Sequence, residues 1–233
     1  MSNDQYSLSW KLYKAHSSLF THDLDFYLDF CGNHKSLEIF SGYGRVTNYL
    51  HSRMANIYAN ELNSEFAKFI QIPEKKKFIC DFFKMNTKES FERIFCAYNS
   101  FSLVTEENEV TQFFYQLDCL LKSGGKISLS YSHPRDWHYS LKHSFKLDGK
   151  QVYYEPCFDL NNLDKGGATW IDKYIIGNEE KTFSYDVKVY NGAEDIQKYL
   201  EGTRLKVVSI VKEFNKPNDF EELGWIDYII QKF

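Results

Sequence analysis

Apolar residues change their spacing along the chain, and the change divides it into segments of different expected structure. From about residue 4 to residue 30 they recur three and four residues apart, which predicts helix. Beyond residue 35, short apolar runs alternate with helical stretches, and alternating strands and helices predict a parallel sheet covered on both faces. The strands are expected at 36–40, 56–60, 77–80, 93–97 and 126–131, and the helices after the first strand to residue 53, at 64–71 and at 106–121.

Past Pro134 the pattern becomes an alternation of apolar and polar residues, which is typical of antiparallel strands. The alternating runs are 141–147, 151–157, 168–176 and 181–190, with turns at Asp148-Gly149, Gly166-Gly167 and Gly177-Asn178. We expect these runs to form an insertion over the carboxyl edge of the main sheet. A short helix at 192–200 and a last pair of strands at 205–214 and 225–233, joined by a polar turn at 215–219, are expected to finish that sheet as a hairpin.

Together these segments predict one α/β domain with a mostly parallel, seven-stranded sheet and helices on both faces. We expect residues 1–34 to form an N-terminal helical region and 35–131 the sheet's core. Residues 134–190 would form the inserted antiparallel region, and 191–233 the C-terminal helix and hairpin.

Composition agrees with a folded globular domain. The 233 residues are 43% hydrophobic and 26% charged, with 4 prolines, which excludes disordered, collagen-like and fibrous classes. Aromatic residues make up 18%, with 17 Tyr and 20 Phe, more planar surface than a core of this size usually needs. We therefore expect some of them to line a pocket.

Charge and cysteine usage narrow the partners and the compartment. The net charge is −4 and the densest basic run is 75–77, so nucleic acid is not expected to be a partner. No stretch approaches the length of a membrane span and the N-terminus lacks a signal-peptide core, so we expect a cytoplasmic protein. The cysteines are odd in number and form no CxxC pair, which favours reduced thiols: Cys31, Cys80, Cys96, Cys119 and Cys157.

The strongest local motif is LEIFSGYGR at 37–45, a junction from strand to turn to helix. It places Gly42 and Gly44 one residue apart in the turn, where the lack of a Cβ lets a ligand approach the backbone. In an open parallel sheet the ligand crevice lies outside the carboxyl ends of the strands. Alone, the motif is equally typical of a tight turn that enters a helix.

Further polar residues fall where a nucleotide-like ligand would need them. Glu61 follows the second strand, where a carboxylate can accept both hydroxyls of a ribose, and Asp81 follows the third, near an expected adenine amino group. Asn99 and Ser100 follow the fourth strand, and LLKSGGKISLSY at 120–131 leads into the fifth. Each alone is more typical of an ordinary surface residue, and only their joint placement indicates a site.

In this order and spacing, residues 35–131 resemble the class I S-adenosylmethionine-dependent methyltransferases, particularly the small-molecule branch. That branch carries motifs of the form LELxCGTGR, then an acidic residue, Asp, NSF and LKPGG. The resemblance implies a Rossmann-like fold, S-adenosylmethionine as cofactor and methyl transfer as the reaction. Phe40 departs from the pattern, because many members have glycine there.

The resemblance also implies roles for individual residues. Glu38, Gly42 and Gly44 would surround the methionine part with help from Asn99, Glu61 would bind the ribose, and Asp81 with Phe82 would hold the adenine. The other residues expected at the cofactor are Tyr13, Arg45 and Leu62.

Two aromatic groups can be read as core packing or as an acceptor site. Tyr6, Trp10 and Tyr13 lie at roughly helical spacing, so they form either an amphipathic packing face or a lid over cofactor and acceptor, and we favour the lid. The second group forms either core packing or an aromatic wall that receives a planar or cationic acceptor. Its members are Tyr131, Trp137, Tyr154 and Trp170.

Histidines at five-residue steps do not indicate a metal site. His133, His138 and His143 fit neither one helical face nor one strand face, and no HExxH motif accompanies them. His133 follows the fifth strand on the crevice side, so it is the candidate general base, with a solvated loop histidine as the alternative.

We expect a methyltransferase that acts on nitrogen or oxygen of a small molecule, and nitrogen is favoured because a convincing base is absent from the motifs. One alternative is another use of the same cofactor, such as intramolecular alkyl transfer or cyclisation. A nicotinamide-dependent oxidoreductase is less favoured, because Val46 and Thr47 stand where a third glycine is expected. The last alternative is a catalytically silent cofactor-binding protein that forms a homodimer through the inserted strands.

Overall fold

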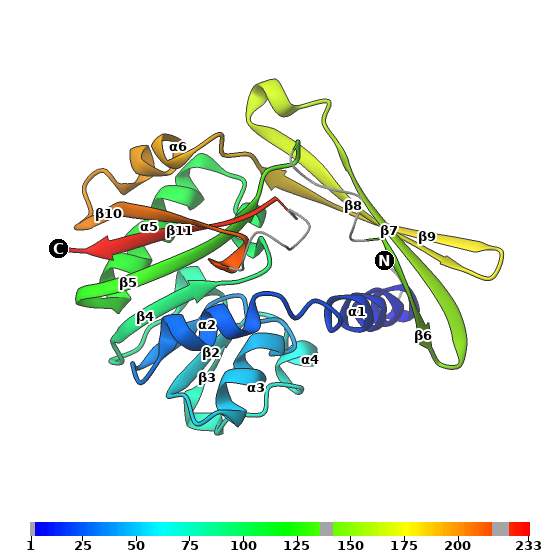
Figure 1. The fold of residues 1–233 in the computed structure, drawn as a ribbon, viewed down its shortest axis with the longest axis horizontal. Coiled ribbons are helices and arrows are strands. Elements are labelled where there is room, and N and C mark those ends of the chain that lie inside the picture. The colour runs from blue at the N-terminus through cyan, green and yellow to red at the C-terminus, as the bar shows by residue number, and fades with distance from the viewer. Residues whose placement is uncertain (1–2, 136–141, 216–223) are drawn as a thin grey trace.

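The computed structural model describes residues 3–135, 142–215 and 224–233. Within these residues the strands form two separate sheets, a seven-stranded main sheet and a four-stranded inserted sheet (Figure 1). The main sheet contains β1 (Ser36–Glu38), β2 (Ile57–Glu61), β3 (Lys77–Ile79), β4 (Phe91–Cys96), β5 (Leu121–Ser132), β10 (Leu205–Lys212) and β11 (Trp225–Lys232). The inserted sheet contains β6 (His143–Leu147), β7 (Lys150–Asp159), β8 (Gly167–Ile176) and β9 (Glu179–Lys188).

Helices connect most of the strands of the main sheet. The α-helices are α1 (Asn3–Ser17), α2 (Leu24–Cys31), α3 (Arg45–Ser52), α4 (Ser64–Ala67), α5 (Glu107–Leu120) and α6 (Ala193–Gln197). Short 3₁₀ helices occupy Glu74–Lys76, Phe82–Lys84, Ser100–Leu103, Leu163–Lys165, Lys198–Leu200 and Glu213–Asn215.

The strand order of the main sheet is β10-β11-β5-β4-β1-β2-β3. The pairs from β3 to β5 are parallel, and β11 runs antiparallel to both β5 and β10, so the mostly parallel sheet and the terminal hairpin are confirmed. The chain leaves β1 toward β2 on one side and β4 lies on its other side. This reversal of order places the ligand crevice outside the carboxyl ends of β1 and β4.

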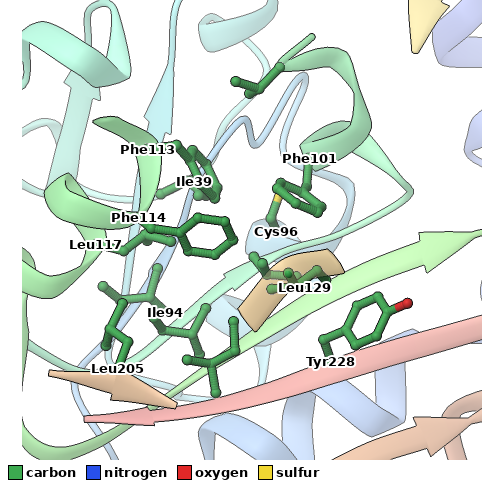
Figure 2. Packing of buried hydrophobic residues seen from close by; sticks show 14 of the residues in the cluster. Ile39, Ile94, Cys96, Phe101, Phe113, Phe114, Leu117, Leu129, Leu205 and Tyr228 are labelled. Carbon is green, nitrogen blue, oxygen red and sulfur yellow. The ribbon is translucent and has the colours of Figure 1, made fainter. Parts of the chain in front are cut away.

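Helices cover both faces of the main sheet, each with its own apolar core. Side chains alternate along β4, so that Ile94 and Cys96 enter the core under α5 and α6 while Phe95 enters the core under α2 and α3. Figure 2 shows the first core, where Phe113, Phe114 and Leu117 of α5 meet Ile94 and Leu129 from the sheet. The central strand β4 is therefore buried on both faces, as a covered parallel sheet requires.

The inserted sheet is antiparallel throughout, as its alternating pattern predicts. Helix α1 lies beside it (Figure 1), and Leu12 of α1 is buried with Val152, Tyr154, Tyr174 and Phe183 of the sheet. Burial of apolar surface thus attaches α1 to the inserted sheet. Dimerisation through this sheet stays a prediction.

Several boundaries differ from the sequence prediction. The helix expected over residues 4–30 is two helices, because Arg45 binds the carbonyl of Phe20 and the carboxylate of Asp23 between them. The helix at 64–71 ends at Ala67, and Asn48 then binds the backbone of Phe69 and Gln71.

Two strands also begin or end elsewhere than expected. β5 begins at Leu121, and the expected turn at 123–125 is an irregularity inside it, with Gly124 at a φ of +74°. β10 ends at Lys212, because Glu213 and Phe214 take φ values of 45° and 55° that leave the extended conformation.

Candidate active site

A cavity of about 520 Å³ lies at the carboxyl edge of the main sheet, between that edge, α1 and the inserted sheet. Small-molecule sites typically enclose about 300–1,000 Å³. The main domain contributes, among others, Phe40, Gly42, Glu61, Leu62, Asn63, Phe83, Tyr98 and Asn99, and the covering elements contribute Trp10, Tyr13, His16, Trp170, Asp172, Phe183 and Tyr185. The cavity therefore lies at the predicted crevice.

The turn after β1 takes the backbone path of a glycine turn although it contains phenylalanine. Phe40 has a φ of 54°, in the left-handed region that costs a non-glycine residue about 1–2 kcal/mol. Its ring packs against Phe82 and Phe113, with centroids 5.7 and 6.0 Å away, and this packing helps to hold the conformation. Gly42 (φ 56°) has no atom within 4 Å of where a Cβ would stand, so this turn offers open backbone to a ligand.

Glu61 joins the turns that follow β1 and β2. Its Oε2 accepts the N–H of Gly42 and its Oε1 accepts the N–H of Asn63, both at 2.7 Å. Burial raises the pKa of Glu61, and the backbone hydrogen bonds oppose that shift. A carboxylate has about four lone-pair positions, so Glu61 can still accept hydrogen bonds from a ligand's hydroxyl groups.

The segment after β3 places Phe83, and not Phe82, on the cavity. Phe82 is 2% exposed and packs in the core against Phe40 and Phe113, whereas Phe83 lines the cavity. Asp81 accepts the N–H of Phe83 at 3.0 Å and begins the short helix there, outside the cavity lining. Of these two rings, Phe83 is therefore the one that lies on the cavity.

Two consecutive left-handed residues follow β4. Tyr98 and Asn99 have φ values of 55° and 59°, a conformation that asparagine tolerates but tyrosine rarely adopts. The Tyr98 ring stacks on Trp225 at 5.7 Å, and the Oδ1 of Asn99 accepts the N–H of Ser132 at 3.3 Å. Such strain is concentrated at functional sites, and both residues line the cavity.

Helix α1 places Trp10, Tyr13 and His16 along one side of the cavity. Phe66 packs on the first two, with centroids 6.5 Å from Trp10 and 5.8 Å from Tyr13. Burial raises the pKa of the Tyr13 hydroxyl, so it stays protonated at neutral pH. Tyr6 lies on the same helix, and its side chain is outside the described part of the chain.

The inserted sheet places a buried carboxylate on the cavity wall. Asp172 is 4% exposed, and its Oδ1 accepts the hydroxyl of Tyr154 at 2.7 Å and the Nε1–H of Trp170 at 2.8 Å. Burial raises its pKa to about 6, against the lowering effect of those two hydrogen bonds. Cross-strand neighbours on β9, Phe183 and Tyr185, line the same wall.

His16 is held neutral beside this wall. Its ring stacks on Tyr154 with centroids 4.0 Å apart, and Nδ1 lies 2.6 Å from the hydroxyl of Tyr174. Burial is the largest cause that lowers its pKa to about 3, followed by the nearby His143. A histidine with so low a pKa is a weak base at neutral pH.

Three expected cofactor residues lie behind the cavity and support its turns. Glu38 is 3% exposed and accepts a hydrogen bond from Thr47, and burial raises its pKa to about 8. A Cβ on Gly44 would lie 3.0 Å from Ile70, which makes glycine a packing requirement there. Arg45 forms two 2.6 Å contacts with the carboxylate of Asp23, so its guanidinium serves the connection between α1 and α2.

The structure does not bring His133, Tyr131 or Tyr154 to the cavity surface. The Nδ1 of His133 accepts the N–H of Arg135, so the expected general base has no cavity contact. Tyr131 is 1% exposed and its hydroxyl accepts the N–H of Tyr190, which makes it a core residue. Tyr154 lies behind Asp172, and Trp137 is outside the described residues, as is His138.

Sequence reasoning missed Asp172 and His16. A signal for Asp172 was present, because it stands in the alternating run at an inward position between Trp170 and Tyr174. His16 continues the spacing of Trp10 and Tyr13 by three residues. Among the described residues, no cluster of three or more His, Cys, Asp or Glu side chains could hold a metal ion.

No family model and no curated protein matches the chain. Solved structures do match over nearly the whole chain. An S-adenosylmethionine-dependent methyltransferase from Clostridium acetobutylicum has a TM-score of 0.69 at 17% identity and covers 91% of each chain. CalS10, an S-adenosylmethionine-bound amino pentose methyltransferase from Micromonospora echinaspora, has a TM-score of 0.72 at 10% identity over 92% of each chain.

The chain has a methyltransferase fold. The sugar N-methyltransferase KedS8 from Streptoalloteichus gives the same result, with a TM-score of 0.69 at 13% identity over 98% of this chain and 93% of that one. At these identities the likeness concerns the fold, and the fold expected from the sequence motifs is confirmed. In the described part of this methyltransferase fold, no helix is long and apolar enough to cross a bilayer.

Proposed function

We propose that the chain is an S-adenosylmethionine-dependent methyltransferase that methylates a nitrogen of a small molecule. The observation that carries the proposal is one continuous cavity. It joins the open glycine turn and Glu61 on the main sheet to a second wall formed by α1 and the inserted sheet. Such a cavity can hold a cofactor and an acceptor side by side.

The residues at the main sheet fit the cofactor. Gly42 leaves room against the backbone, Glu61 keeps acceptor positions for ribose hydroxyls, and Phe83 offers an aromatic face beside Asp81 for the adenine. Asn99 lies at the adjacent strand end, where it can contact the methionine part. That CalS10, with the same fold, is described as bound to S-adenosylmethionine supports this assignment.

When bound, S-adenosylmethionine supplies an electrophilic methyl group and departs as S-adenosylhomocysteine. The protein's part is to orient the acceptor and to exclude water, which can lower a barrier by about 7–11 kcal/mol in favourable cases. We assign the exclusion of water to α1, whose Trp10 and Tyr13 would act as the lid over the cavity.

Nitrogen is favoured over oxygen as the methyl acceptor, because the histidine on the cavity is a poor base. A weakly acidic hydroxyl needs a base to remove its proton, whereas an amine needs only to be unprotonated when it attacks. His16 is the histidine among the described cavity residues, and its lowered pKa makes it a poor base. The description of KedS8 as a sugar N-methyltransferase is in line with nitrogen as the acceptor.

Mass spectrometry of reaction products tests this proposal. The protein, S-adenosylmethionine and a panel of small primary and secondary amines and alcohols are incubated together. We expect a mass gain of one methyl group on amines, with S-adenosylhomocysteine formed in equal amount. Release of methylthioadenosine without a methylated product would instead indicate alkyl transfer from the cofactor's aminobutyl arm, and no turnover with any member would favour a silent cofactor-binding protein.

A further inference from the structure

The wall of the cavity that the inserted sheet forms carries a carboxylate, Asp172, that has no ion-pair partner among the described residues. Asp172 is 4% exposed. No Lys, Arg or His nitrogen of the described residues forms an ion pair with its carboxylate within 4.0 Å. A buried carboxylate is costly unless it is hydrogen-bonded and paired with a positive charge. The described residues supply Asp172 with hydrogen bonds but with no ion-pair partner.

The hydrogen bonds of Asp172 are arranged so that one oxygen remains available. Tyr154 and Trp170 both donate to Oδ1, at 2.7 and 2.8 Å, and no described residue donates to Oδ2. These donors come from two neighbouring strands, β7 and β8, so the carboxylate is fixed in orientation before any ligand binds. A carboxylate of this kind is preorganised for a hydrogen-bonded cation.

Aromatic rings surround the carboxylate. After the larger effect of burial, the charge of Asp172 helps to raise the pKa of five tyrosines, which shows that they lie within its electrostatic reach: Tyr13, Tyr98, Tyr154, Tyr174 and Tyr185. Of these, Tyr13, Tyr98 and Tyr185 line the cavity, together with Trp170. Their rings offer electron-rich faces to a cation and apolar surface to its carbon skeleton.

We propose that Asp172 binds the protonated amine of the acceptor through Oδ2 and takes the proton that the nitrogen loses before it attacks. The inference rests on the proposed methyl transfer and names the substrate class as a small primary or secondary ammonium ion with an apolar or planar body. One N–H bond breaks, its electron pair stays on nitrogen as the attacking lone pair, and the proton forms an O–H bond on Asp172. The methylated product then leaves and the proton passes to water.

The raised pKa of Asp172 suits its role as acceptor of a proton from the ammonium ion. A carboxylate with a pKa near 6 is mostly ionised at neutral pH, so it can attract an ammonium ion, and it is a better proton acceptor than an ordinary surface aspartate. The titratable groups that face it are Tyr13 and His16 from α1, Tyr98 from the loop after β4, and the tyrosines of β7, β8 and β9. None of these is a cation at neutral pH, since His16 is neutral.

Binding of matched ammonium and hydroxyl compounds tests the proposal without knowledge of the natural acceptor. Calorimetry in saturating S-adenosylhomocysteine compares benzylammonium, cyclohexylammonium and 2-phenylethylammonium with benzyl alcohol, cyclohexanol and 2-phenylethanol. We expect an ammonium member to bind more tightly than its hydroxyl counterpart. Asp172→Asn should weaken ammonium binding about 10- to 100-fold, as loss of a charged hydrogen bond predicts, and leave the alcohols unchanged.

Two further variants separate a binding role from a structural one. Asp186→Asn removes an exposed carboxylate from the same inserted sheet and should change neither class of compound. Tyr185→Leu removes a half-exposed cavity ring, and we expect a few-fold loss for the ammonium ions alone.

The possible failures are distinct. If the protein does not bind S-adenosylhomocysteine, the proposed function itself is wrong. If it binds the cofactor product but no ammonium ion binds better than its hydroxyl counterpart, or if Asp172→Asn keeps the preference, methyl transfer stands and the role of Asp172 is wrong. If Asp172→Asn does not fold, the proposal rests on the ammonium preference of the unchanged protein and on its loss in Tyr185→Leu, and an unchanged preference in that variant would contradict the proposed site.

Discussion

Two of the carboxylates that line the cavity, Glu61 and Asp172, are held by different kinds of donor. Backbone N–H groups of Gly42 and Asn63 fix Glu61, whereas side chains of Tyr154 and Trp170 fix Asp172. Glu61 could be predicted because it stands at the carboxyl end of a strand, and strand ends define the crevice of a parallel sheet. Asp172 was missed, since an inward position in an alternating strand also fits core packing until the opposing wall is known.

Replacing Glu61 by glutamine should weaken cofactor binding. The variant keeps an acceptor oxygen for a backbone N–H but loses the charge that strengthens hydrogen bonds from two ribose hydroxyls. We expect the affinity for S-adenosylhomocysteine to fall about 10- to 100-fold, measured by calorimetry. Glu65→Gln alters an exposed residue four positions away on α4 and should bind normally. Equal affinity of Glu61→Gln and the unchanged protein would mean that Glu61 does not contact the ribose.

At the scale of elements, strands and helices were predictable where their pattern is long and regular. All the antiparallel strands of the insertion were found, because alternation and the turn residues Asp148-Gly149 and Gly177-Asn178 agree. The division of the first helix was missed, since the cause is the distant Arg45, which binds Phe20 and Asp23. Local pattern cannot show a boundary that a residue far along the chain imposes.

The end of helix α3 offers a test of backbone strain. Met54 follows the helix with a φ of 67° and is 92% exposed, so its side chain gains little from packing. Glycine occupies this conformation without the steric penalty, and Met54→Gly should stabilise the protein by about 1 kcal/mol, or about 2–4 °C in the melting temperature. Met54→Ala keeps the penalty and should not melt higher. If both variants raise the melting temperature equally, backbone strain at Met54 is not the cause.

At the scale of the whole molecule, the cavity exists only where three parts meet. The expected cofactor side comes from one stretch, roughly residues 40 to 104, so its motifs could be recognised in order. The acceptor side comes from α1 and from β8 and β9, more than a hundred residues apart in sequence. Their meeting depends on packing of Leu12 against the inserted sheet, which no local motif records.

A buried carboxyl group should make the stability of the whole protein depend on pH. Asp227 is 0% exposed, its Oδ1 accepts hydrogen bonds from Tyr27 and Ser128, and its Oδ2 has no hydrogen-bond partner among the described residues. Burial raises its pKa from 3.8 to about 7 in the folded protein. The folded state therefore binds the proton more strongly than the unfolded state, so this group lowers stability as pH rises from about 4 to about 7.

The variant Asp227→Asn removes this dependence, because its amide is neutral at every pH. We expect it to melt higher than the unchanged protein at pH 8, and the difference to shrink toward pH 4, as scanning calorimetry can measure. The exposed substitution Asp186→Asn should leave the pH dependence as it is. A melting difference that grows toward low pH would contradict the assignment.

We expect this cavity to bind S-adenosylmethionine, and a calorimetric titration of the purified protein measures that binding. S-adenosylmethionine, S-adenosylhomocysteine and NADH are titrated in parallel under the same conditions. We predict micromolar, one-to-one binding of the first two and no heat from NADH. Binding of NADH alone, or of none of the three, would contradict this expectation and show that the turn around Phe40 does not accept the sulfonium cofactor.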